Sequence, residues 1–75
     1  MKINNRHILE KDRKLHRCLA ILKKLQDGAT LHPRTTADEF GVNERSILRD
    51  FQSLSEAGFP LVKKKLHGFS WELMK

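Results

Sequence analysis

A short break between two helical segments constrains the fold of this chain more than any other sequence feature. The break is Gly41-Val42-Asn43. Gly41 has no Cβ and can take the positive φ that ends a helix, while the Asn43 side chain can accept hydrogen bonds from the first amides of the next helix. Pro33 fits the first turn of a preceding helix, because the N–H that it lacks would be unpaired there. The sequence therefore predicts a short helix from Pro33, a tight turn, and a new helix from Glu44.

The helix that is expected over residues 44–57 is amphipathic. Ile47, Phe51 and Leu54 recur at spacings of four and three residues, which places them on one face. The side chains on the opposite face are polar or cationic: Arg45, Arg49, Gln52 and Ser53. The pattern predicts a helix that packs on a core along one side and exposes its arginines along the other.

Another amphipathic helix is expected near the start of the chain, after an N-terminal arm over residues 1–7. Its apolar stripe consists of Ile8, Leu15, Cys18, Leu19, Leu22 and Leu25. The cations on its opposite side, which we expect to form a solvated face, are Arg13, Arg17 and Lys24. Asp27-Gly28 marks its end. We therefore divide the chain into the arm and one domain over residues 8–75.

The end of the chain changes to the two-residue period of a β-strand. Alternation places three apolar side chains on one face of the last strand: Phe69, Trp71 and Leu73. The partner strand begins at Leu61-Val62, and residues 64–68 form a basic loop between the two. All aromatic side chains are expected in the core: Phe40, Phe51, Phe59, Phe69 and Trp71.

This order of elements predicts a mainly α domain with a small β-hairpin. The helix over residues 33–40 and the helix that follows it form a helix-turn-helix, and the hairpin is the wing beside it. The expected fold is a winged helix-turn-helix with three helices.

Composition restricts the functional classes. The 75 residues include 15 Lys plus Arg and 9 Asp plus Glu, a formal net charge of +6, which favours a polyanionic partner. A chain this short buries only about 60% of its unfolded surface, so we expect no enzyme, no cofactor and no small-molecule pocket. Cys18 is the only cysteine and no metal-ligand pair is present, which points to a reducing compartment. No apolar run reaches the roughly 20 residues of a membrane span. We expect a cytoplasmic protein.

Three stretches of the chain resemble one protein family. They are residues 13–25, residues 37–51 (Ala-Asp-Glu-Phe-Gly-Val-Asn-Glu-Arg-Ser-Ile-Leu-Arg-Asp-Phe), and residues 56–61 (Glu-Ala-Gly-Phe-Pro-Leu) with the later Gly68-Phe69. These stretches are similar to the amino-terminal winged helix-turn-helix domain of DeoR-type and WYL-domain bacterial transcription regulators. Two positions depart from the family pattern, which usually has Arg at Leu48 and Leu at Thr36.

The resemblance implies sequence-specific binding of double-stranded operator DNA in the bacterial nucleoid. The helix over about 44–57 would enter the major groove, which is about 12 Å wide and admits one helix. The wing, residues 63–68, would lie on the backbone or over the minor groove. Base contacts are expected from Arg45, Ser46 and Arg49. Backbone contacts are expected from Arg34, Thr35, Asn43, Gln52, Lys63, Lys64, Lys65 and His67, with at most two of the three lysines facing DNA together, because side chains alternate along a strand.

Several alternatives stay open on the sequence alone. The domain could instead be a winged-helix interaction module that docks on an acidic protein. Leu48 either contacts a thymine methyl or pads the core against the wing, and Asn43 either contacts phosphate or only caps its helix. A twofold-symmetric operator would require two copies of the chain, so a homodimer is one expected assembly.

Overall fold

The computed structural model describes residues 10–65 and 68–74, with the backbone alone for residues 10 and 11. The expected arm over residues 1–7, Ile8 of the apolar stripe and His67 of the loop lie outside the described residues. The elements follow the chain in this order: α1 (Glu10–Gln26), α2 (Pro33–Phe40), α3 (Glu44–Glu56), β1 (Leu61–Lys65) and β2 (Phe69–Leu73).

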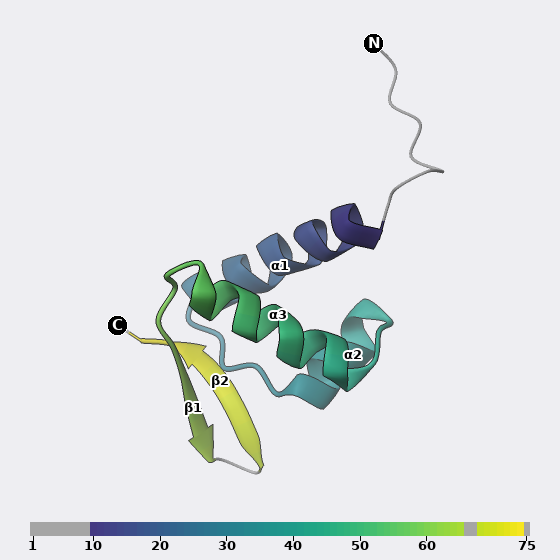
Figure 1. Cartoon of the computed structure of the whole chain (residues 1–75). Helices are drawn as coiled ribbons and strands as arrows, with labels where there is room; N and C mark the ends of the chain where they lie inside the picture. Colours follow the sequence, from purple (N-terminus) through teal and green to yellow (C-terminus); the bar gives the residue numbers. More distant parts are fainter. Residues whose placement is uncertain (1–9, 66–67, 75) are drawn as a thin grey trace.

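The elements form a three-helix unit with a β-hairpin at its side (Figure 1). α3 packs against both α1 and α2, and the hairpin that follows it turns back against all three helices. β1 and β2 are antiparallel, as expected for a wing. The predicted fold class is confirmed, because the described residues form a mainly helical domain with a small hairpin in a winged-helix layout.

Each helix ends in the same backbone motif, and each motif contains a glycine. After α2, the Val42 N–H donates to the Ala37 carbonyl at 3.0 Å and the Gly41 N–H donates to the Asp38 carbonyl at 3.3 Å. Gly41 has φ 67°, in the left-handed region that glycine enters at the lowest cost. Equivalent pairs of bonds follow α1 and α3, around Gly28 and Gly58. The turn chemistry of the sequence thus determines where all three helices stop.

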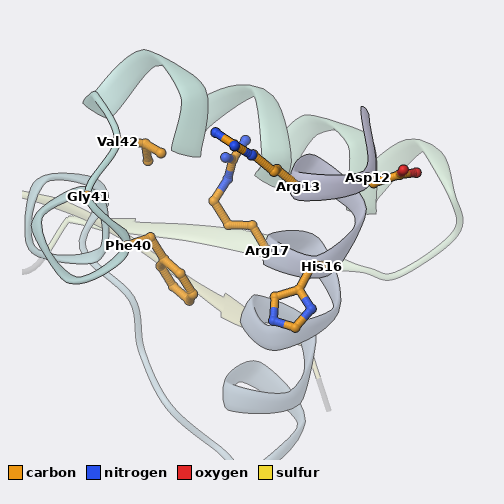
Figure 2. A pocket seen from close by; sticks show the side chains of 7 residues that line it. All are labelled: Asp12, Arg13, His16, Arg17, Phe40, Gly41 and Val42. Carbon is orange, nitrogen blue, oxygen red and sulfur yellow. The ribbon is translucent and has the colours of Figure 1, made fainter. Parts of the chain in front are cut away.

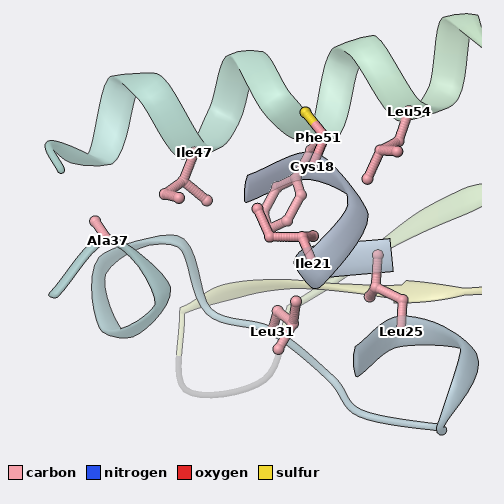
Figure 3. Close-up of a cluster of buried hydrophobic side chains, with 8 residues drawn as sticks. All are labelled: Cys18, Ile21, Leu25, Leu31, Ala37, Ile47, Phe51 and Leu54. Atoms are coloured by element: carbon pink, nitrogen blue, oxygen red, sulfur yellow. The ribbon is translucent and has the colours of Figure 1, made fainter. Parts of the chain in front are cut away.

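The core lies where α1, α3 and β2 meet (Figure 3). The buried apolar side chains are Cys18, Ile21, Leu25, Leu31, Ala37, Ile47, Phe51 and Leu54. Phe51 stacks on Trp71, with ring centroids 5.1 Å apart. Thr36 is also buried, and its hydroxyl donates to the His32 carbonyl at 2.8 Å. The unusual threonine is therefore accommodated because its polar group is paired.

The hairpin is longer than the sequence pattern predicted. β1 continues through Lys65, which pairs with Phe69, so only residues 66–68 connect the strands. On its other side β2 is bridged by Leu31, whose N–H donates to the Trp71 carbonyl at 2.7 Å and whose carbonyl accepts from the Trp71 N–H at 2.8 Å. This exchange attaches the wing to the segment before α2 and fixes its position relative to the helices.

Three expected core residues are exposed. Leu15 and Leu19 are 59% and 57% exposed, and they line an open apolar groove between α1 and the end of α3. The buried face of α1 is rotated from the predicted stripe: Ile21, which the stripe left out, is fully buried, whereas Leu15 and Leu19 are not covered by α3. Phe69 is 50% exposed, because it lies at the far end of the hairpin, beyond the core.

Candidate nucleic-acid interface

The outer face of α3 carries two exposed arginines, Arg45 and Arg49. Their spacing of four residues places them one helical turn apart on the same side, opposite the buried stripe. Neither forms an ion pair with any described residue. Both guanidiniums therefore keep their planar set of donors for an external acceptor.

The start of α3 is capped by Asn43. Its side-chain Oδ1 accepts from the Ser46 N–H at 2.8 Å, and the residue has the extended backbone of an N-cap. The predicted cap is confirmed. A contact between Asn43 and phosphate stays a prediction, and the side-chain N–H groups of Asn43, which the cap does not use, could donate to it. Ser46 is half-buried and lies four residues before the buried Asp50, so it sits at the edge of the outer face rather than at its centre.

Gln52 is exposed on the same side of α3, one turn beyond Arg49. Its Nε2 donates to Glu56 Oε2 at 3.3 Å. To contact the DNA backbone, the Gln52 side chain would have to break its hydrogen bond with Glu56 and form one with a phosphate. The carboxylate of Glu56 also marks the point at which the outer face stops being cationic.

The three lysines of β1 are divided between the two faces of the wing. Lys63 and Lys65 lie on the face turned towards α3, because they pair across the hairpin with Trp71 and Phe69. The Lys63 Nζ lies 4.5 Å from the Phe69 ring centroid and 5.3 Å from that of Trp71, so Lys63 covers the sheet. Lys64 points to the other face, where it forms an ion pair with Glu72. Lys65 has no ion pair within the described part of the chain.

Arg34 and Thr35 are both exposed in the first turn of α2. The His32 Nδ1 accepts from the Arg34 backbone N–H at 3.2 Å, so the histidine fills the capping position. The side chain of Arg34 has no ion pair with a described residue. The contacts of Arg34 and Thr35 with the DNA backbone stay predictions.

A buried charge cluster that joins α3 to α1 was not predicted. Asp50 is completely buried on α3, and its carboxylate accepts from Arg17 Nε, from Arg17 Nη2 at 3.1 Å and from Lys14 Nζ at 2.8 Å. The Arg17 side chain is only 14% exposed, whereas that of Lys14 is 40% exposed. We call these three residues the α1–α3 charge cluster.

The cluster corrects the expected role of Arg17 as part of a solvated face. Burial alone would raise the pKa of Asp50, but the hydrogen bonds and charges of Arg17 and Lys14 outweigh it and hold that pKa below its usual range. One signal was present in the sequence: Asp50 falls between Ile47, Phe51 and Leu54 on the buried side of the helix. A carboxylate in that stripe requires a cation from another element.

Two further cations of α1 have carboxylate partners among the described residues. Lys24 pairs with Glu39 of α2 at 2.8 Å, and Lys23 pairs with Asp27 at 3.6 Å. Lys24, also expected on the solvated face of α1, therefore links α1 to α2 through a partly exposed ion pair. Cys18, next to the charge cluster, is buried, and burial followed by the Asp50 carboxylate raises the pKa of its thiol. The thiol is protonated at neutral pH.

An open hollow of about 570 Å³ lies between α1 and the turn after α2. Figure 2 shows side chains that line this hollow, among them Arg13, His16 and Arg17 of α1 and Phe40 of α2. Its volume is within the range of small-ligand sites. The expected absence of a small-molecule pocket therefore stays a prediction.

The described residues contain neither a metal-binding cluster nor a membrane-spanning helix. No group of three or more His, Cys, Asp or Glu side chains in residues 10–65 and 68–74 could hold a metal ion. Over the same residues, no helix has the length and apolar character needed to cross a membrane.

Comparisons with known proteins yielded no relative of this chain. No protein-family model, no curated protein and no solved structure matches it.

Proposed function

We propose that this domain binds double-stranded DNA sequence-specifically, as a cytoplasmic bacterial transcription regulator or as the DNA-binding module of one. α3 would lie in the major groove and the wing would lie on the adjacent backbone or over the minor groove. The resemblance to DeoR-type and WYL-domain regulators supports the same reading. No catalytic step is part of the proposal.

The observation that carries this proposal is the difference between paired and unpaired cations. On α1, Lys14, Arg17 and Lys24 are each bonded to a carboxylate of another helix. On the exposed side of α3, Arg45 and Arg49 have no carboxylate partner among the described residues. Unpaired guanidiniums on a projecting helix match the acceptors that guanine O6 and N7 and phosphate present along the major groove.

The fold also supplies cations beside α3. Lys65 and Lys63 share the wing face that is turned towards α3, and Arg34 lies at the start of α2. Contacts from such positions fix the register of a protein on DNA without reading sequence. We assign Arg45 and Arg49 to base readout, with Ser46 at the edge of the readout face. A twofold-symmetric operator would bind two copies of the chain.

Selection of bound duplexes from a random pool tests the proposal. The expected result is an enriched sequence, bound with an affinity that falls with salt at a log–log slope near −5 if five or six phosphates are neutralised, at about −0.9 for each phosphate. A control duplex with the enriched bases scrambled should bind more weakly with a similar slope. No enrichment, together with no complex at about 100 µM of any duplex, would reject DNA binding. Such a result would favour the interaction module for an acidic protein.

A further inference from the structure

One side chain on the exposed side of α3 does not fit a purely polar interface. Leu48 is 39% exposed, and it is the one apolar side chain among the exposed residues of this helix. It follows Arg45 by three residues and precedes Arg49 by one, so it lies on the edge of the outer face that is nearer to the wing. Residues three and four apart on a helix are neighbours on its surface.

Leu48 faces a shallow cleft between α3 and the wing. The cleft is also lined by Pro33, Lys63 and Phe69, and its volume is about 320 Å³. Phe69 is exposed too, so the two apolar side chains border the cleft without closing it. A leucine that only padded the core would be covered as Leu54 is, which is 6% exposed. Packing against the wing therefore leaves part of the Leu48 side chain open to an external contact.

The major groove offers one kind of apolar group to such a side chain. Of the four bases, thymine alone carries a methyl group on its groove edge, and the other recognition groups there are hydrogen-bond donors and acceptors. Leu48 has no polar atom with which to satisfy those groups. Placed against a cytosine, adenine or guanine edge, it would cover polar atoms without pairing them.

We infer that Leu48 is a specificity residue that contacts the 5-methyl group of a thymine, at a base pair adjacent to the one read by Arg45 or Arg49. This inference rests on the proposed function and deepens it, because it states which base the site prefers at one position. Leu48 can make only an apolar contact with a base, because its side chain has no hydrogen-bonding atom. It therefore discriminates by a single methyl group.

Substitution of deoxyuridine for thymidine, one position at a time, tests the inference in the duplex selected from the random pool. This exchange removes only the methyl group. With the unchanged protein, one thymine of each half-site should show a loss of about fourfold in affinity, the equivalent of burying one methyl-sized group. The same exchange elsewhere should have no effect beyond that of the methyl group on DNA shape.

The Leu48→Ala variant should bind the thymine and uracil duplexes with equal affinity at that position. Its urea midpoint, followed by Trp71 fluorescence, should stay close to that of the unchanged protein, which shows that the variant is folded. If it does not fold, Leu48→Gln keeps the side-chain volume and gives the same comparison. Leu19→Ala is the matched control, since Leu19 is an exposed leucine on α1, and this variant should retain the fourfold difference.

Two results would overturn the inference. One is the absence of any sensitive thymine in a duplex that the protein binds specifically. The other is a sensitive thymine whose effect persists unchanged in Leu48→Ala and in Leu48→Gln. Both presuppose a selected duplex, so they are distinct from failure of the proposed function, in which no duplex is enriched.

Discussion

The α1–α3 charge cluster predicts that substitution of Asp50 lowers the free energy of unfolding much more than substitution of Lys14, which the sequence pattern alone does not predict. Asp50→Asn removes the negative charge while keeping the shape of the side chain, and it takes away the buried carboxylate that the largely buried Arg17 contacts. Breaking a buried ion pair by removing one partner costs about 3–5 kcal/mol. A domain of this length holds roughly 4–11 kcal/mol in total, so the variant should be close to unfolding. Lys14→Gln should cost less than about 1 kcal/mol, because that side chain is 40% exposed.

Urea denaturation followed by the fluorescence of Trp71 measures these losses, since Trp71 is the only tryptophan and stacks on the buried Phe51. The matched control is Lys23→Gln, which breaks an ion pair that is exposed on both sides and should change the free energy of unfolding very little. If Asp50→Asn loses no more stability than Lys23→Gln, the charge of the buried carboxylate does not stabilise the domain and the prediction is wrong.

Three further predictions follow from the same structure. The pKa of Asp50 is lowered in the folded state, so the stability that its charge provides is fully present above the unfolded-state pKa near 3.9 and should be lost as the pH falls through the folded-state pKa. Urea titrations below pH 5 should therefore show a shallower loss of stability with falling pH in Asp50→Asn than in the unchanged protein. Equal pH dependence in the two proteins would contradict a lowered pKa of Asp50. Gly41→Ala should lower the free energy of unfolding by about 1–2 kcal/mol because of the positive φ alone, since nothing lies within 4 Å of the added Cβ. Gly41→Asn should lose less, because asparagine enters the left-handed region more readily, and thermal melts of both variants measure the difference. Equal losses would point to a cause other than φ. Arg49→Ala should lower DNA affinity and relax base preference at one position by about 1–3 kcal/mol, whereas Lys65→Ala should weaken binding to all duplexes alike. Titrations with the selected and the scrambled duplex separate the two effects. If Arg49→Ala weakens binding to both duplexes equally, Arg49 contacts the DNA backbone and not a base.

Local chemistry made much of the fold predictable. The bounds of α2 and the start of α3 follow from Pro33, Gly41 and Asn43, whose effects act within a few residues. The two-residue period of β2 is likewise a local signal. The arginines on the outer face of α3 were predicted because the spacing of its buried residues fixes which side is exposed.

What could not be predicted depends on partners that are distant in the sequence. Asp50 lies 33 residues from Arg17 and 36 from Lys14, and no local pattern states that these elements meet. Similarly, the predicted stripe of α1 contained Leu19 and left out Ile21, and only the packing of α3 decides that Ile21 is covered and Leu19 is exposed. Lys64 and Lys65, expected in the loop, belong to β1 because they pair across the hairpin with Ser70 and Phe69.

Amide NMR spectra recorded during titration with the selected duplex test the central claim, that α3 and the wing form the DNA-binding surface. The account predicts that the largest shifts fall in residues 43–52 and 63–65, while the exposed face of α1 around Leu15 and Leu19 is little changed. Shifts centred on that face of α1, with the amides of α3 unaffected at saturation, would contradict it.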